Sequence, residues 1–122
     1  MSRPQRQRRI CAMPEYTVFA PDHASGGAPV SLSLDEFETL RLMDYEGCTH
    51  EQCAAVMQIS RTTVTEIYAA ARHKLTCALV EGRALVIGGG SVSLCDRSAD
   101  CALGVCGRGD APFGESGGRG GE

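Results

Sequence analysis

Hydrophobic positions repeat at helical spacing in three consecutive segments of the chain, and each segment opens with a residue that can cap a helix. The first segment starts at Ser33, which fits a capping box with Glu36, and Gly47 supplies a C-terminal stop. Its apolar residues at helical spacing are Phe37, Leu40 and Met43. This pattern predicts a first helix between Ser33 and Gly47.

Two further helices are predicted directly after the first. The second segment opens with a capping box of Thr49 and Gln52, and the third opens at Ser60 and ends at Gly82. The residues that share one face of the third helix are Val64, Ile67, Ala71, Leu75 and Leu79. We therefore expect a mainly α fold with three helices.

Two short stretches outside the helices have the composition of β-strands. Residues 16–19 are β-prone and are bounded by Pro14 and Pro21, and residues 84–87 are apolar and are bounded by glycines. Our hypothesis is that they pair as a short two-stranded unit. Residues 22–31 have the composition of a loop.

Glycine is concentrated at the C-terminal end, where 11 of the 15 glycines lie in residues 88–122. Such a stretch cannot bury enough apolar surface to offset the entropy lost on ordering the backbone. We therefore predict a flexible Gly/Cys-rich tail over residues 88–122. The folded domain is then expected at residues 11–87, preceded by a basic arm at residues 1–10.

Charge is segregated as strongly as glycine. Residues 1–10 carry four arginines and no acidic residue, and residues 59–87 carry four basic residues against two acidic ones. Residues 31–58 carry six acidic residues against Arg41 alone. The net charge of -3 at first argues against nucleic-acid binding, which is usually a property of basic domains. The two basic segments show that this total is misleading.

The second and third helices have the spacing of a DNA-reading helix-turn-helix. This motif needs a small residue where the helices cross, and Ala54 occupies that position. It also needs a buried apolar residue in the turn, which Ile59 supplies. Gln58 stands where glycine is favoured, because the chain there usually takes a positive φ, at a cost of roughly 1 kcal/mol for other residues.

In a helix-turn-helix, the outward face of the third helix would enter the major groove of DNA. The candidate contacts on this helix are Arg61, Thr62, Thr63, Thr65, Glu66, Arg72 and Lys74. Arg61 can form a fork onto guanine or clamp a phosphate. The basic arm resembles segments that follow the minor groove or the phosphates. It adds the candidate contacts Arg3, Arg6, Arg8 and Arg9.

Two alternatives stay open at this point. A helix-turn-helix can serve only to pack or to bind another protein, and an arginine-rich arm can be a solvated tail that aids solubility.

Residues 33–75 resemble the promoter-reading C-terminal domain of bacterial sigma factors. A wider arrangement runs from the arginine-rich start and Cys11, through the strand ending at Phe19, to ALVEGRALVIGG at residues 78–89. It is similar to a prokaryotic family of uncharacterised, predicted DNA-binding proteins with a sigma-like helix-turn-helix. The resemblance covers residues 3–89 and implies DNA binding, without a ligand or target.

The chain departs from that family pattern at three positions. The pattern favours glycine where Gln58 stands, and glutamine and then arginine where Thr65 and Glu66 stand. Glu66 replaces a positive charge of the family pattern with a negative one, so we expect this chain to differ from the family in phosphate affinity or in base preference.

Three cysteines of the tail, Cys95, Cys101 and Cys106, have the spacing C-x5-C-x4-C. Structural zinc sites usually show tight C-x2-C pairs and four ligands. Zinc or iron–sulfur binding at these cysteines therefore stands beside the alternative of unligated thiols. No other cofactor is indicated.

The remaining features favour a non-enzymatic, cytoplasmic protein. The three histidines are scattered, and no catalytic arrangement includes them. The apolar runs are shorter than the ~20 residues needed to cross a membrane, and the basic N-terminus lacks the apolar segment of a secretory signal.

We expect a sequence-specific DNA-binding protein that regulates transcription, with double-stranded DNA as its partner. RNA polymerase is a further candidate partner. A homodimer would suit such a protein, but no dimer interface is visible in the sequence. The alternatives are an interaction module that docks on the transcription machinery through its acidic first helix, and a metal- or redox-responsive regulator that uses the tail cysteines.

Overall fold

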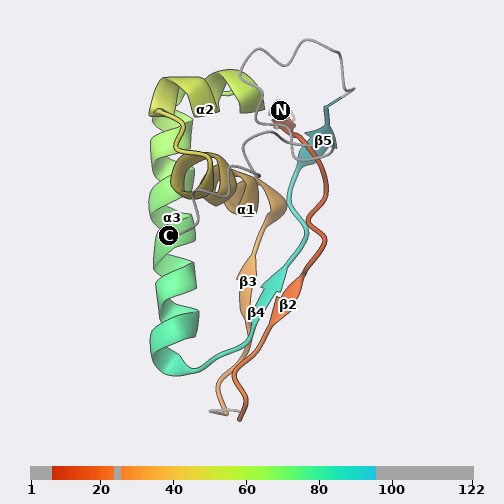
Figure 1. Cartoon of the computed structure of the whole chain (residues 1–122), viewed down its shortest axis with the longest axis vertical. Coiled ribbons are helices and arrows are strands. Elements are labelled where there is room, and N and C mark those ends of the chain that lie inside the picture. Colours follow the sequence, from red (N-terminus) through yellow and green to blue (C-terminus); the bar gives the residue numbers. More distant parts are fainter. Residues whose placement is uncertain (1–6, 24–25, 96–122) are drawn as a thin grey trace, which may run out of the picture.

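Three helical segments pack against one side of a small β-sheet in the computed structural model of the chain, which describes residues 7–23 and 26–95 (Figure 1). Helix α1 (Leu34–Leu40) continues into a π-helical turn, η1 (Arg41–Tyr45). Helix α2 (His50–Met57) and the long helix α3 (Arg61–Glu81) follow. The prediction of three helices is confirmed. Within the described residues, no helix combines the length and apolar character needed to cross a membrane.

The helices begin and end where local signals in the sequence predict. Ser33 and Thr49 both form complete capping boxes: the cap side chain accepts from the backbone N–H three residues later, and the cap backbone N–H donates to the side chain of that residue, Glu36 or Gln52. The Ser60 hydroxyl caps α3 by accepting from the Thr63 N–H at 3.1 Å. Gly82 ends α3 in the left-handed conformation, with φ 66°.

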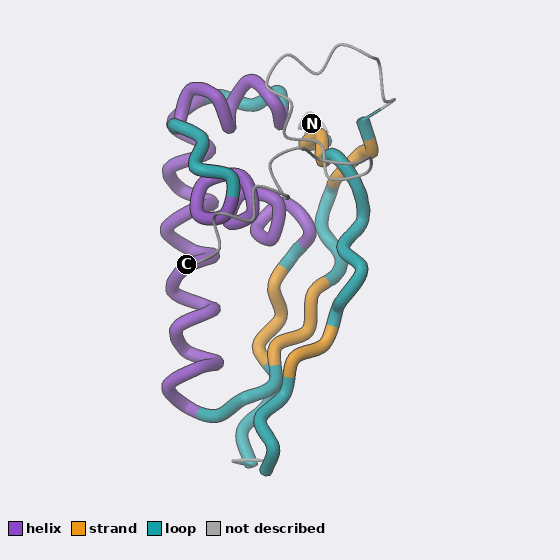
Figure 2. The backbone as a smooth tube through the Cα atoms, viewed as in Figure 1, coloured by secondary structure: helices purple, strands orange, loops and turns teal. Residues whose placement is uncertain are grey.

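The sheet next to the helices has three strands in the order β2-β4-β3, shown as orange segments in Figure 2. Strand β2 (Val18–Phe19) pairs antiparallel with β4 (Leu85–Ile87), which confirms the predicted pairing of the two β-prone stretches. Strand β3 (Val30–Leu32) pairs parallel with the other edge of β4.

The expectation of a loop over residues 22–31 is wrong for its last two residues, and the sheet has one strand more than expected. Val30 and Leu32 are buried while Ser31 between them is exposed. A strand of three residues with two buried positions is too short a pattern to identify from sequence. These residues form a strand because the edge of β4 that β2 leaves unpaired offers them backbone hydrogen bonds.

A second, parallel pair joins the two ends of the described fold. Strand β1 (Arg8–Ile10) pairs with β5 (Val92–Leu94), and the Cys95 N–H donates to the Ile10 carbonyl at 2.8 Å. These strands lie outside the range 11–87 expected for the domain, so the ordered unit is wider at both ends. Residues 96–122 of the predicted tail lie outside the described residues.

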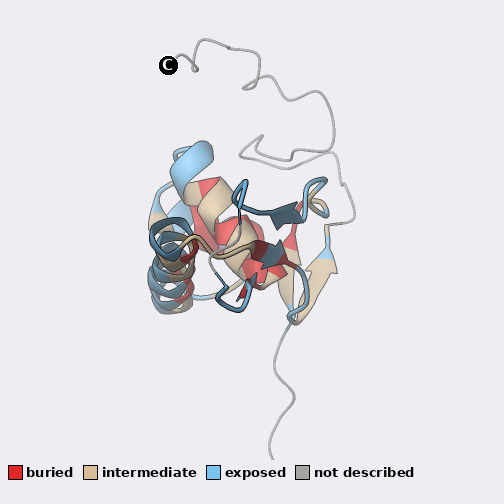
Figure 3. Cartoon of the chain, turned by 90° about the horizontal axis from the view of Figure 1, so that it is seen from below, coloured by how far each residue is buried: buried red, intermediate tan, exposed pale blue. Residues whose placement is uncertain are grey.

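The buried residues, red in Figure 3, gather where the helices and the strands face each other. One cluster joins the sheet to α3 and includes Leu32, Leu85, Ile87 and Ala71. A second cluster joins α2 to the start of α3 and includes Cys53, Met57 and Val64. The apolar face predicted for α3 is buried or half-buried as far as Leu75, whereas Leu79, the last residue of that face, is 74% exposed.

Candidate nucleic-acid interface

The turn between α2 and α3 consists of Gln58, Ile59 and Ser60. Gln58 has φ 60° and ψ 47°, and it is the one residue other than glycine with a positive φ among the described residues. The positive φ predicted for this position is confirmed. The N–H groups of Gln58 and Ile59 both donate to the Ala54 carbonyl, so the left-handed residue closes α2 and starts the turn.

Packing beneath the turn fixes the direction in which α3 leaves it. Met57 and Val64 have no exposed surface, and Ala54 is buried beside them. The Thr39 hydroxyl of α1 donates to the Met57 sulfur at 3.4 Å. This bond joins α1 to α2, and Val64 packs the first turn of α3 into the same buried cluster, which makes this end of α3 a well-packed support for exposed side chains.

The exposed face at the start of α3 carries Arg61, Thr62, Thr65 and Glu66. The side chains of Arg61 and Glu66 form no ion pair within the described part of the chain. Thr65 turns its hydroxyl back to the Arg61 carbonyl at 3.2 Å. Thr63 differs from its neighbours, because it is half-buried and its hydroxyl lies 2.8 Å from Ser60 Oγ. The structure therefore brings together four of the five residues expected here as a solvent-facing set.

The other two candidates on α3 contact acidic residues of the neighbouring segments. Arg72 Nε lies 3.4 Å from Asp44 Oδ2, and its guanidinium stacks 5.0 Å from the centre of the Tyr68 ring. The Tyr68 hydroxyl donates to Asp44 Oδ1 at 2.6 Å, and this hydrogen bond is the main cause that raises the pKa of Tyr68. Lys74 Nζ lies 2.8 Å from Glu36 Oε1. Arg72 and Lys74 thus brace α3 against η1 and α1.

The arginines of the predicted arm fall into two pairs. Arg8 forms an ion pair with Asp35 at 3.2 Å, and Arg9 Nε donates to the Val56 carbonyl in the last turn of α2 at 2.8 Å. Arg3 and Arg6 lie outside the described residues. Because Arg9 contacts the end of α2, strand β1 lies at the end of the molecule where α2 meets α3 (Figure 1).

A buried ionic cluster, which was not predicted from the sequence, joins α1 and η1 to the residue after β1. The Arg41 guanidinium contacts the carboxylates of Glu38 and Glu46 at 3.0 Å, and the Cys11 N–H donates to Glu38 at 3.0 Å. Burial alone would lower the pKa of Arg41, but its hydrogen bond to Glu38 and the surrounding negative charge raise it. The spacing of Glu38 and Arg41, three residues apart on a helix, is the signal that could have indicated this pair.

The acidic character of the first helix is therefore directed inward. Asp35 and Glu38 are buried, and Glu36 is bound by Lys74. Of the six acidic residues in residues 31–58, Asp44 and Glu51 are the exposed ones. This stretch presents far less negative charge to solvent than its composition indicates.

Of the three cysteines considered as metal ligands, the structure describes only the first, Cys95. Cys95 is half-buried after β5, whereas Cys101 and Cys106 lie outside the described residues. In residues 7–23 and 26–95, three or more histidine, cysteine or acidic side chains do not gather into a group that could hold a metal ion. Cys53 is fully buried, and burial raises the pKa of its thiol to about 12.

Comparison with known proteins places the whole described fold within one sequence family. Residues 1–94, which end with β5, match the family model described as "Protein of unknown function DUF134". The chain is similar to a UPF0251 protein of Desulfitobacterium hafniense (strain DSM 10664 / DCB-2), with 46% identity over 98 residues that cover 79% of this chain and 78% of the relative.

A UPF0251 protein of Methanothermobacter thermautotrophicus is 38% identical over 101 residues, covering 83% of this chain and 53% of the relative. Similar proteins thus occur in both bacteria and archaea. No solved structure matches the chain.

Proposed function

Because the chain belongs to the DUF134 family, whose description assigns no activity, its function has to be inferred from its surface, and we propose that it is a sequence-specific DNA-binding protein that regulates transcription. Membership confirms the resemblance to an uncharacterised prokaryotic family. In this proposal α2, the turn at Gln58 and α3 act as a helix-turn-helix, with α3 as the recognition helix.

The observation that carries the proposal is the exposed set Arg61, Thr62, Thr65 and Glu66 at the start of α3. Residues near the N-terminal end of a recognition helix are the ones that reach base edges in the major groove. The rigid packing of Met57 and Val64 beneath them supports this role, since a reading surface has to keep its geometry. Arg61 is available for a ligand because its guanidinium has no ion pair within the described residues.

Each exposed side chain suits a specific part of DNA. Arg61 can donate two hydrogen bonds to guanine, and the methyl group of a threonine can contact the methyl group of thymine. Glu66 can accept from the cytosine amine, so its negative charge favours a cytosine-containing site. The chain would then differ in base preference from relatives that carry a basic residue at this position.

Arg72 and Lys74 are secondary candidates in this proposal. Arg72 remains 60% exposed beside Asp44, so it can approach a phosphate without leaving its partner. Lys74 is turned toward Glu36 of α1. We assign the base-reading role to the start of α3, and to Arg72 only contacts with the phosphates of the DNA backbone.

The alternative of a module that docks through an acidic first helix has little support. Asp35 and Glu38 are buried, and Glu36 and Glu46 are bound by Lys74 and Arg41. A partner that recognises negative charge would find few free carboxylates on this helix. DNA binding through α3 is therefore the function that the surface supports best.

The test is selection of bound sequences from a random pool of double-stranded DNA, using the full chain. We expect an enriched motif, and we expect Arg61→Ala to weaken binding to that motif by about 1–3 kcal/mol. Arg61→Lys retains the charge but not the fork, so it should lose most of the discrimination while keeping binding to unrelated DNA.

Thr76→Ala is the matched control, because Thr76 is exposed on the same helix but far from its start. It should bind DNA as the wild-type chain does. A pool without any enriched motif would overturn the proposal.

A further inference from the structure

A histidine and a cysteine lie side by side in the second half of α3. His73 is exposed and Cys77 is half-buried, and the two are one helical turn apart. Cys77 Sγ lies 3.4 Å from His73 Nε2. An imidazole nitrogen and a thiol sulfur that converge in this way can donate lone pairs to the same metal ion.

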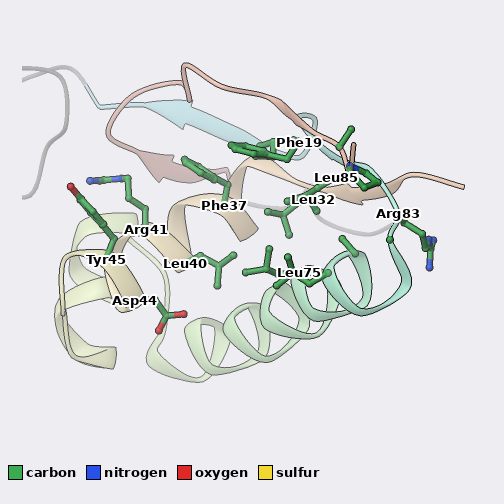
Figure 4. Close-up of a pocket in the computed structure, with 16 residues that line it drawn as sticks. Phe19, Leu32, Phe37, Leu40, Arg41, Asp44, Tyr45, Leu75, Arg83 and Leu85 are labelled. Carbon is green, nitrogen blue, oxygen red and sulfur yellow. The ribbon is translucent and has the colours of Figure 1, made fainter. Parts of the chain in front are cut away.

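The opposite side of this half of α3 is occupied by the fold itself. Leu75, midway between the two residues in the sequence, lines with Leu32 and Leu40 an apolar groove of about 650 Å³ between α3, α1 and the sheet (Figure 4). Positions two apart on an α-helix are separated by about 200° around its axis, so His73 and Cys77 face away from the groove. A ligand can therefore approach the pair from solvent.

The distance within the pair suits tetrahedral zinc. With zinc bonds of about 2.3 Å to sulfur and about 2.0–2.1 Å to nitrogen, two such ligands lie about 3.6 Å apart on a tetrahedral ion. The 3.4 Å between Sγ of Cys77 and Nε2 of His73 is close to this value. Zinc can therefore be bound with small side-chain rotations and no change in the helix backbone.

Two ligands from one chain leave a tetrahedral ion incomplete. Glu81, one turn beyond Cys77, already forms an ion pair with Arg83 at 2.8 Å. Within the described residues, a third histidine, cysteine or acidic side chain does not join the pair. A second copy of the chain supplies what is missing, because a two-fold axis through the ion brings another His73 and Cys77 to it. Two cysteines and two histidines then form the closed ligand set of a structural zinc site.

The surroundings of the pair allow a second helix to come close. Ala69 and Ala70, one turn before the pair, are exposed and small, and the distance between packed helices depends on the side chains at the contact. The two cations beside His73, Arg72 and Lys74, are bound by acidic groups of η1 and α1. Their positive charges are thereby directed away from an incoming metal ion.

We propose that His73 and Cys77 form one half of a zinc site that two copies of the chain complete. His73 donates the lone pair of Nε2, and the Cys77 thiol releases its proton to water and binds as a thiolate. The ion joins the two chains through the outward faces of their α3 helices. His73 lies about two turns beyond Glu66, so the proposal does not depend on DNA binding, and each can be tested without the other.

The first test is titration of Co²⁺ into the full chain, kept reduced with a phosphine in the absence of oxygen. Tetrahedral cobalt should give visible d–d absorption and a thiolate-to-metal charge-transfer band, and both should saturate at one ion for each pair of chains. Cys77→Ser should remove the charge-transfer band, and His73→Gln should weaken binding about a hundredfold or more. His23→Gln is the matched control, because it removes another exposed histidine, and it should bind cobalt as the wild type does.

The second test is sedimentation equilibrium of the full chain with and without Zn²⁺. Zinc should double the mass of the wild-type chain, and a chelator should restore the mass of one chain. Cys77→Ser and His73→Gln, with circular dichroism like that of the wild type, should remain monomers in zinc. A chain that binds no cobalt, that binds one ion per chain without association, or whose mass does not respond to zinc would overturn the proposal.

The cysteines near the C-terminal end provide a further control. A variant that combines Cys95→Ser, Cys101→Ser and Cys106→Ser leaves His73 and Cys77 in place, so it should keep both the charge-transfer band and the zinc-dependent association. If this variant lost them while Cys77→Ser kept them, the metal would belong to those cysteines and the assignment to α3 would be wrong.

Discussion

The Arg41 guanidinium donates two hydrogen bonds of 3.0 Å to the carboxylate of Glu38, one from Nε and one from Nη2. Glu38 is buried. If it were removed, Glu46 would be the one carboxylate of this cluster left to balance the charge of Arg41. Loss of one partner from a buried ion pair costs about 3–5 kcal/mol. The same carboxylate accepts from the N–H of Cys11, the residue after β1, so the pair links α1 and η1 to the end of that strand.

We predict that Glu38→Ala lowers the free energy of unfolding by about 3 kcal/mol or more, as measured by urea denaturation. Glu81→Ala is the matched control, because Glu81 is paired with Arg83 at an exposed site. It should change the free energy of unfolding by less than about 1 kcal/mol. Similar losses in the two variants would contradict the importance of the buried pair.

Replacement of Gln58 by glycine should stabilise the fold. Its φ of 60° is costly for a side chain with a Cβ atom, so Gln58→Gly should raise the free energy of unfolding by roughly 1 kcal/mol. Gln58→Ala keeps the Cβ atom and should leave the stability nearly unchanged. A lower thermal midpoint for Gln58→Gly than for Gln58→Ala would count against this backbone conformation.

Gly90 should be far less tolerant of substitution than Gly88. A Cβ atom on Gly90, which has φ +98°, would lie 3.0 Å from Asp35 Oδ1 and 3.2 Å from the Ser33 Cβ. A Cβ atom on Gly88 would have no neighbour within 4 Å. We predict that Gly90→Ala destabilises the chain by about 1–3 kcal/mol in thermal or urea unfolding, whereas Gly88→Ala has little effect. Equal effects would show that the segment after β4 does not pack on the start of α1.

Stability should fall at high pH partly because of Cys53. The pKa of the thiol is about 8.5 in the unfolded chain, whereas burial raises its pKa in the folded chain to about 12. Between these values the folded state binds the extra proton, so the free energy of unfolding decreases as the pH rises. Cys53→Ala should flatten this decrease in urea titrations across the window. Cys77→Ala, which retains Cys53, should keep the wild-type slope.

The arm should contribute to DNA binding through two arginines rather than four. Arg8 and Arg9 are held by Asp35 and by the Val56 carbonyl, which leaves Arg3 and Arg6 as the candidates for phosphates. Arg3→Ala with Arg6→Ala should therefore flatten the log–log dependence of affinity on salt by about 2 units. An unchanged slope would remove the arm from the interface.

Local sequence signals were sufficient for the helices but not for the sheet. The capping boxes at Ser33 and Thr49 act within four residues, so they identified helix starts without tertiary information. The pairing of residues 16–19 with residues 84–87 could be expected because both stretches have β-prone composition, whereas the register that places Val18 opposite Val86 was not predicted. Strands β1 and β5 could not, because Arg8 and Val92 become strand residues only through each other.

The candidate site was predictable to a similar degree. The positive φ of Gln58 followed from its position in the turn, and the exposure of Arg61 followed from helical period. The contacts of Arg72 and Lys74 did not follow, since Asp44 and Glu36 reach α3 only after α1 and η1 have packed. Composition also indicated an acidic surface on α1. Burial and the ion pairs with Arg41 and Lys74 remove most of that negative charge from the surface, and these contacts could not be read from composition either.

The pairing of β1 with β5 and of β2 with β4 has a consequence for synthesis of the chain on the ribosome. The two early strands leave the exit tunnel without partners, because β4 and β5 are made after all three helices. Helices α1 to α3 can form as they emerge, but Ile10, Val30 and Leu32 stay uncovered until residues 85–94 are free to add their strands. Domains whose closing contacts span the chain complete folding late and expose unpaired edges meanwhile. Chaperone contact with the nascent chain should therefore peak just before β4 emerges and end once β5 has paired.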